Sequence, residues 1–414
     1  MGTTALFSSM LNDNLHYSLL KPELEEKSYL WKNVEHVEDW SNGDLIVPFR
    51  ASRASSVKAG GLTGTTDISS NKYTRGSISG GDSRPEVWMS LIFWHKDILN
   101  HDGSVKEKSF LGSFLPDQMK DAMDMFTKTL NHNVLNAKAL SQAAGGGQAD
   151  GEIVVDRIER FEIGMKITFG TDGTAYYVTA VDINTSTITL SLTRGGAAAD
   201  LTAEAAAVDN ALIYQDGFRL NSLSNLKAIL LSAANGGDAN VYGVSKLLSP
   251  YTQAYNKSGS DITAANILEK LFDAYSTYRQ LAKVGAAEVW LSFKHLGSVM
   301  KKLEDTKGAY KMVEGSMKVS QYGFTEIELF GPKGRLKIVA HQEMDDDVIF
   351  LIDLKSLKIH SNGGIQKHKD PEGKEFYTVR DETNGYAYVV DMLFTGDIVC
   401  SAPYRNAVLF SISY

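Results

Sequence analysis

The clearest periodic pattern of apolar residues in the chain lies between residues 115 and 142. Apolar side chains recur there at spacings of three and four, which places them on one face of a helix. The positions are Leu115, Met119, Met123, Phe126, Leu130, Val134, Ala137 and Leu140. Pro116 and Asp117 suit a first turn, because proline lacks an N–H and a carboxylate is attracted to the positive end of the helix dipole. The pattern predicts one long amphipathic helix over 115–142, ended by a glycine-rich break at 143–151.

Apolar runs typical of strands occur on both sides of this helix. Before it, residues 45–50 and 87–95 predict two strands. After it, residues 152–216 alternate β-type runs with turn signals, which predicts a small β-barrel or sandwich. From residue 220 onward we expect a mixed region, with helices at 221–233, 264–283 and 293–303, strands at 287–292, 335–341 and 348–353, and two strong strands near the C-terminus. The fold class predicted is α+β.

Two segments lack the apolar side chains needed for a core. Residues 1–44 are polar and acidic, with Trp31 and Trp40 as isolated anchors, and predict an arm. Residues 50–84 are rich in Gly, Ser and Thr and are too long for an ordinary hairpin turn. We interpret them as an extended loop that finds its partner on another molecule, with disorder as the alternative.

Charge changes this picture in one respect. The 414-residue chain has a net charge of −8, which excludes a general basic surface for holding a nucleic acid backbone. The extended loop is nevertheless basic, and we take as interface candidates Arg50, Arg53, Lys58, Lys72, Arg75 and Arg84. The predicted long helix carries Asp117, Asp121 and Asp124. Complementary charges on separate segments predict a contact between copies of the chain, the alternative being solvated charges.

Sequence signatures of catalysis are missing. The chain has no phosphate-binding loop, no dinucleotide fingerprint, no zinc-protease motif and no nucleophile elbow. We predict no enzyme activity, no cofactor and no metal site, although an active site of another kind at the acidic turn 345–347 stays an alternative. That turn is expected to be solvated, and His360 and His368 to be ordinary surface residues. The one cysteine, Cys400, excludes an internal disulfide and is expected to be buried. No signal peptide and no membrane-spanning segment are expected.

The order of these parts resembles the major capsid protein of tailed bacteriophages with the Hong Kong 97-type fold. Two passages resemble the family in amino-acid sequence as well. Residues 161–192 are similar to the short β insertions of phage capsid proteins and read FEIGMKITFGTDGTAYYVTAVDINTSTITLSL. Residues 285–305 are similar to the strand and helix of the A-domain and read GAAEVWLSFKHLGSVMKKLED. Residues 334–360 are similar to the hairpin that follows this strand and helix in the A-domain. The resemblance implies an N-arm at 1–44, an E-loop with flanking strands at 45–112, a spine helix within 113–150, an inserted β domain at 151–217, mainly A-domain at 218–354, and P-domain strands at 355–414.

The resemblance implies a subunit that self-assembles into hexamers and pentamers of an icosahedral shell, the virion capsid, around double-stranded DNA that it does not read. Scaffolding and portal proteins, with a decoration protein as an option, are the implied partners, and assembly is expected in the host cytoplasm. Because the arm is short, a separate scaffolding protein is expected. Some family members cross-link lysine to asparagine, for which Lys58 or Lys72 with Asn406 are candidates that no motif identifies. The rival interpretations are an encapsulin-type nanocompartment and a β-rich adhesin or tail binding module.

Overall fold

A computed structural model of the chain describes residues 28–40, 43–52, 72–79, 85–94, 105–136, 139–144, 150–170, 174–202, 211–218, 223–282, 288–305, 318–319, 325–331, 334–367, 377–381 and 385–413. Contacts divide the chain into two compact units. Unit 1 consists of residues 1–135 and 226–414, and unit 2 of residues 136–225. Each unit is described by itself.

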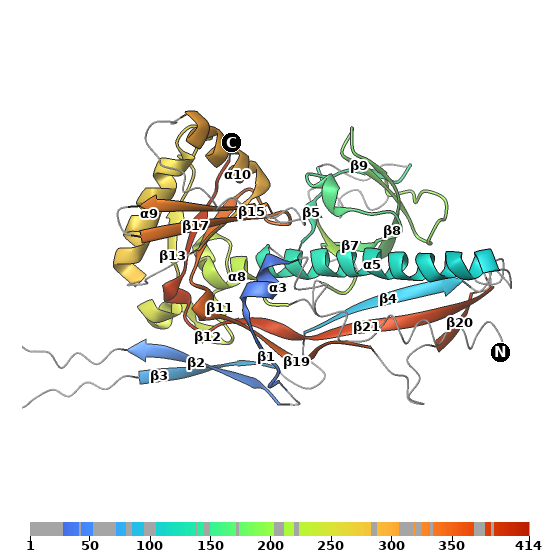
Figure 1. Ribbon diagram of the computed structural model, residues 1–414, viewed down its shortest axis with the longest axis horizontal. Helices are drawn as coiled ribbons and strands as arrows, with labels where there is room; N and C mark the ends of the chain where they lie inside the picture. The colour runs from blue at the N-terminus through green and yellow to red at the C-terminus, as the bar shows by residue number, and fades with distance from the viewer. Residues whose placement is uncertain are drawn as a thin grey trace, which may run out of the picture. The chain divides into compact units, whose positions relative to one another are not determined.

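The long helix of unit 1, α5 (Val105–Leu135), lies against strand β4 (Glu86–Trp94) (Figure 1). Along its whole length β4 pairs antiparallel with β21 (Gly385–Cys400). The other strands of this sheet are β1 (Glu35–Val37), β19 (Leu357–Lys367) and β20 (Tyr377–Asp381), in the order β1-β19-β21-β20. The helix buries the apolar face that its periodicity predicts, with Met123, Phe126, Leu130 and Val134 all inaccessible to solvent or nearly so.

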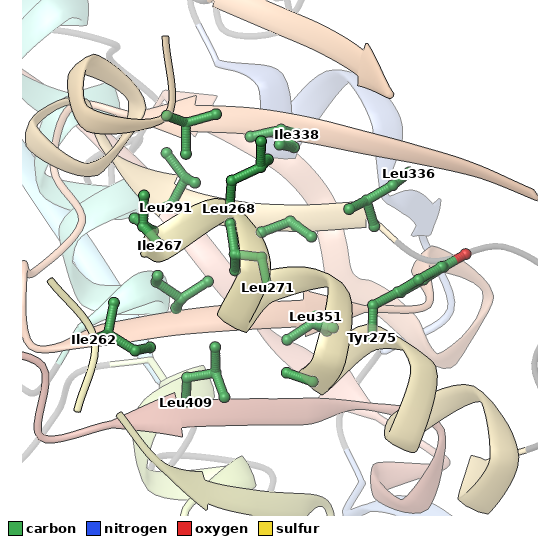
Figure 2. Packing of buried hydrophobic residues seen from close by; sticks show 14 of the residues in the cluster. Ile262, Ile267, Leu268, Leu271, Tyr275, Leu291, Leu336, Ile338, Leu351 and Leu409 are labelled. Atoms are coloured by element: carbon green, nitrogen blue, oxygen red, sulfur yellow. The ribbon is translucent and has the colours of Figure 1, made fainter. Parts of the chain in front are cut away.

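A second sheet of unit 1 has seven strands. Their order is β13 (Tyr255–Ser258), β22 (Ala407–Phe410), β18 (Val348–Ile352), β14 (Glu288–Ser292), β17 (Gly334–His341), β16 (Thr325–Gly331) and β15 (Lys318–Val319). Every residue of β18 is buried, as its unbroken apolar run requires of a strand covered on both faces. The helices of this region are α9 (Ile267–Ala282) and α10 (Phe293–Asp305). Figure 2 shows Ile267, Leu268 and Leu271 of α9 packed with side chains from the sheet.

Strands β2 (Leu45–Ser52) and β3 (Lys72–Ile78) form an antiparallel hairpin that pairs with neither large sheet among the described residues. Its base contacts a segment that we call the platform, residues 240–252. The platform contains β11 (Asn240–Val241), β12 (Val244–Ser245) and the 3₁₀ turns Lys246–Leu248 and Pro250–Thr252. The remaining elements of unit 1 are α3 (Tyr29–Asn33), α8 (Leu226–Leu230) and the 3₁₀ turns Ala233–Asn235, Leu354–Ser356 and Pro403–Arg405.

Unit 2 is a small β-barrel. Its strands are β5 (Ser141–Gln142), β6 (Glu152–Val154), β7 (Lys166–Phe169), β8 (Ala175–Asp182), β9 (Thr187–Ser191) and β10 (Leu212–Gln215), with a 3₁₀ turn at Ile158–Arg160. They follow the order β5-β10-β7-β8-β9-β6, and a bridge between Ala143 and Val155 joins the two end strands. Inward residues such as Ile167, Phe169 and Ile188 fill the interior, so the alternation seen in the sequence corresponds to an inside and an outside.

The predicted α+β class with an inserted β unit is confirmed, but several elements differ from expectation. The long helix starts at Val105 and continues through Pro116, since one missing hydrogen bond does not stop turns that extend one another cooperatively. It ends at Leu135 because Ser141 and Gln142 pair with β10 instead. The predicted helix at 221–233 is reduced to α8. The domain boundaries drawn within unit 1 stay predictions.

Two polar segments contain more structure than their composition predicts. Within the expected arm, Tyr29, Leu30 and Trp31 of α3 are buried, Trp40 also lies in the interior, and β1 pairs parallel with β19. The arm itself stays a prediction. The segment 50–84 is not loop throughout, because residues 72–78 form β3 opposite β2. In both cases the stabilising partner is far away in the sequence, so local composition gave no indication of it.

Candidate functional site

The β2–β3 hairpin has one packed face and one open face. Val47 and Phe49 alternate onto the packed face and are almost fully buried. Gly76 lies beneath the Phe49 ring, where an added Cβ would be 2.9 Å from Phe49 Cε2 and 2.9 Å from the carbonyl oxygen of Tyr242. The packed face therefore depends on a glycine at that position and on close contact with the platform.

The open face presents apolar and basic side chains together. Ile46 is 57% exposed and Tyr73 60% exposed, although both are large and apolar. The strand register places three cross-strand pairs on this face: Ile46 with Ser77, Pro48 with Arg75, and Arg50 with Tyr73. The register shifts before the Ser52–Lys72 pair, and Lys72, next to Tyr73 in β3, lies on the other face. A mixed surface of this kind, with an apolar centre and cations around it, is typical of a protein interface.

Two of the six predicted basic candidates, Arg50 and Arg75, lie on this open face, whereas Lys72 lies on the other face of β3. Arg53, Lys58 and Arg84 lie outside the described residues. Lys72 and Arg75 are exposed, as an intermolecular role requires. Arg50 is less available for a contact with another copy, because its guanidinium carbon lies 5.8 Å from the centre of the Tyr251 ring of the same chain. A side-chain hydrogen bond with Tyr73 raises the pKa of Arg50 above its ordinary value.

The predicted acidic candidates lie on α5. Asp121 is exposed and Asp124 is half-buried, whereas the side chain of Asp117 lies outside the described part of the helix. Lys120 and Lys128 are exposed on the same helix, so this stretch of α5 is mixed in charge and not acidic. The contact between these aspartates and the basic residues of another copy stays a prediction.

The acidic turn between β17 and β18 is held by contacts with other elements of unit 1, which corrects the prediction of a solvated turn. The Lys227 ammonium lies 3.4 Å from Asp345 Oδ2 and 2.7 Å from Asp347 Oδ2. His295 Nε2 is 2.7 Å from the carbonyl oxygen of Asp346, and burial lowers the pKa of this histidine. The turn is thus held by α8 and α10, two elements that the local sequence could not point to.

Two further residues also have structural positions. His360 Nδ1 is 2.8 Å from Asp39 Oδ1 and its side chain is mostly covered, so it is no ordinary surface histidine; His368 lies outside the described residues. Asn406, the imagined cross-linking residue, is fully buried. Its amide nitrogen donates to Ser356 Oγ at 2.8 Å and its oxygen accepts from the Asp353 N–H at 2.9 Å. An amide engaged on both sides and shielded from solvent does not fit a reaction with a lysine of another subunit.

Cys400 is buried, as predicted. Burial raises the pKa of its thiol to about 12, which leaves it protonated and unreactive. Within the described residues, no group of three or more His, Cys, Asp or Glu side chains is arranged to hold a metal ion. None of the helices in the described ranges is long and apolar enough to cross a membrane.

Sequence reasoning missed an anchor at the N-terminal side of unit 1. Ser28 Oγ donates to Asn131 Oδ1 of α5 at 2.7 Å and also caps α3. The Tyr29 hydroxyl donates to Glu288 Oε1 at 2.8 Å, and Lys337 Nζ lies 4.6 Å from the centre of the Tyr29 ring. A capping serine followed by the cluster Tyr-Leu-Trp was the available signal for this short buried helix.

Comparisons with known proteins gave matches among solved structures alone. No family model matches the sequence, and no curated protein matches it significantly. The capsid asymmetric unit of cyanophage A-1(L) is 11% identical, with a TM-score of 0.46 over 95% of this chain and 93% of that one. The capsid of a native GTA particle is 10% identical, with a TM-score of 0.44 over 94% and 91%. A virus-like particle from Pyrococcus furiosus is 9% identical, with a TM-score of 0.38 over 97% and 98%. Each of these solved structures is matched over nearly the whole length of this chain, at low sequence identity.

Proposed function

We propose that this chain is the major capsid protein of a tailed phage, which self-assembles into the icosahedral shell around the double-stranded DNA genome. The observation that carries the proposal is the hairpin with one packed and one open face. A two-stranded hairpin has little stability of its own, yet this one exposes Ile46 and Tyr73 beside the cation Arg75. Such a surface gains stability when a partner covers it.

Self-association is the role that this geometry supports best. A surface that every copy carries, and that meets a different surface on the next copy, generates rings when the rotation closes. Hexamers and pentamers are rings of this kind. The net charge of −8 also suits a shell that encloses DNA without holding its backbone tightly. Scaffolding and portal partners and assembly in the host cytoplasm are part of the proposal.

Two surfaces of unit 1 are candidates for receiving the hairpin of a neighbouring copy. One is the exposed part of α5 around Asp121, where Arg75 would pair with this carboxylate between the exposed Lys120 and Lys128. The other is the outer face of β4, where Trp88 and Ile92 are 45% and 40% exposed and would meet Ile46 and Tyr73. Charge reversal at Asp121 impairs assembly if the first surface is used, and Ile92→Ser impairs it if the second is used.

The proposal is tested by sedimentation velocity and negative-stain microscopy of the full chain, expressed alone and with candidate scaffolding proteins. We expect closed shells or ring-shaped capsomers. A well-folded monomer under every condition would contradict self-assembly and favour a binding module. Purified shells that contain protein cargo and no DNA would replace the phage capsid with a nanocompartment.

A further inference from the structure

Tyr242 has a backbone conformation that tyrosine rarely adopts. The platform strands β11 and β12 pair Asn240 with Ser245 and Val241 with Val244, which leaves Tyr242 and Gly243 as a two-residue turn. The φ angles of these two residues are +49° and +80°. Turns with two positive φ angles are dominated by Asn, Asp and Gly, and a bulky residue there is strained. Tyr242 therefore persists because surrounding contacts hold it, and such strain is often found where a residue has a mechanical or functional task.

The hydroxyl of Tyr242 is anchored on the edge of β21. It donates to the carbonyl oxygen of Ile398 at 3.0 Å and accepts from the N–H of Cys400 at 3.0 Å. These two backbone groups lie beyond the last residue of β21 that pairs with β4, Thr395. One side chain thus occupies the edge position that another strand would take. Burial and the nearby Asp397 raise the pKa of Tyr242, so the hydroxyl stays neutral and can donate and accept at once.

The rest of Tyr242 contacts both strands of the hairpin. Its carbonyl oxygen accepts from the N–H of Ser77 in β3 at 3.0 Å. Its ring stacks on the Phe49 ring of β2, with the ring centres 6.0 Å apart and the planes at 19°. Gly76 leaves room for this carbonyl, because a Cβ there would lie 2.9 Å from it. A single strained residue therefore touches β2, β3 and β21.

The platform that carries Tyr242 is itself fixed. The Lys246 ammonium donates to the carbonyl oxygens of Ala228 and Leu231 at the C-terminal end of α8, and Thr252 Oγ1 donates to the carbonyl of Lys246. Beside Tyr242, the platform touches β2 through Ser249 Oγ, which donates to the Arg50 carbonyl at 3.4 Å, and through the Tyr251 ring. The first of these is a long hydrogen bond and the second a contact at 5.8 Å. The Tyr242 carbonyl makes the shorter hydrogen bond to the hairpin, 3.0 Å to the N–H of Ser77.

We propose that Tyr242 is the joint that sets the direction in which the β2–β3 hairpin leaves the rest of unit 1. The hydroxyl fixes the joint to β21, and the ring and the carbonyl hold the hairpin. The consequence for assembly rests on the proposed function: if hairpins bind neighbouring copies, a fixed direction gives every copy the same angle to the next, and a loose one gives shells of uneven size.

The joint can be tested in the unassembled full chain by measuring the distance between spin labels on Lys72→Cys and Lys301→Cys. Both positions are exposed, and the native Cys400 is buried and stays unlabelled. The test variant is Tyr242→Phe, which keeps the ring and removes the anchor on β21. The matched control is Tyr251→Phe. It removes a hydroxyl from the same platform, and this hydroxyl makes no hydrogen bond to any described residue. We expect a broader distance distribution for Tyr242→Phe and a wild-type distribution for the control.

A second variant keeps the test decisive in the case that Tyr242→Phe does not fold. Tyr242→Asn suits the positive φ and removes both the ring and the hydroxyl, so the turn stays while the joint is lost. Wild-type distributions for both Tyr242 variants would overturn the joint. A broader distribution accompanied by shells of normal, uniform size would overturn its role in assembly. A broader distribution in a chain that never assembles would leave the joint established and count against the proposed function alone.

Discussion

The two faces of β2 allow a sharp test of how the hairpin is held and used. Phe49 on the packed face is 1% exposed, and Ile46, three residues earlier on the open face, is 57% exposed. Replacing a buried phenylalanine by alanine removes about 3 kcal/mol or more of burial and packing. Since the hairpin pairs with neither large sheet among the described residues, this loss falls on its attachment to the platform. A loss of about 3 kcal/mol corresponds to roughly a hundredfold increase in local opening.

The measurement is hydrogen exchange of the amides of β3, above all the Ser77 N–H that donates to Tyr242. In Phe49→Ala we expect their protection to fall roughly a hundredfold while the urea midpoint of the whole chain stays close to wild type. Ile46→Ala is the matched control on the same strand: it leaves the exchange unchanged but weakens assembly. Unchanged protection in Phe49→Ala would refute the docking argument. A loss of about 3 kcal/mol, the full amount, from the free energy of global unfolding in urea would show that the hairpin unfolds together with the cooperative core.

Three other predictions concern stability and assembly. Burial lowers the pKa of His341 to about 3. The neutral histidine therefore contributes its full share of stability above about pH 6.5, and this share is lost as pH falls toward 3. Between about pH 7.5 and 5.5 the free energy of unfolding should fall by about 1.4 kcal/mol, and by less in His341→Leu. Asn406→Ala leaves the buried Asp353 N–H without its partner and removes one hydrogen bond of Ser356 Oγ, which still donates to the Asp353 carbonyl. It should lower the free energy of unfolding by about 2 kcal/mol in urea titrations. Reversing the charge of Arg53 and Arg75 together should leave the monomer folded by circular dichroism yet impair assembly by sedimentation, because exposed ion pairs are weak singly but repeat in every subunit; normal shells would count against an electrostatic role of the loop.

Much of the fold could be predicted because its signals are local. The spacing of Met123, Phe126, Leu130 and Val134 defines one face of α5 without reference to anything else in the chain. The apolar run of β18 and the alternation in unit 2 are of the same kind. What failed depended on distant partners: β3 forms because β2 lies opposite it, and α3 is buried because α5 and β14 provide Asn131 and Glu288.

The candidate site could be predicted in outline for a similar reason. The basic character of the segment 50–84 is visible in composition, and Lys72 and Arg75 are indeed exposed on the hairpin. The sequence could not indicate that Arg50 lies over Tyr251, or that Lys120 and Lys128 accompany the aspartates of α5. Side-chain neighbours set by strand register and by packing between elements are non-local, whereas composition is local.

Tyr242 illustrates how local rules and assembly can conflict within one residue. Its turn alone would favour asparagine, and the strain of a positive φ is unfavourable for the isolated subunit by about 1 kcal/mol. The two hydrogen bonds to β21 and the contacts with Phe49 and Ser77 offset this strain. An asparagine side chain is too short to make the same bonds, so relieving the strain would release the hairpin. If selection acts on the shell and not on the subunit, the strained tyrosine is the expected choice, because a hairpin direction shared by all copies has no value for a monomer.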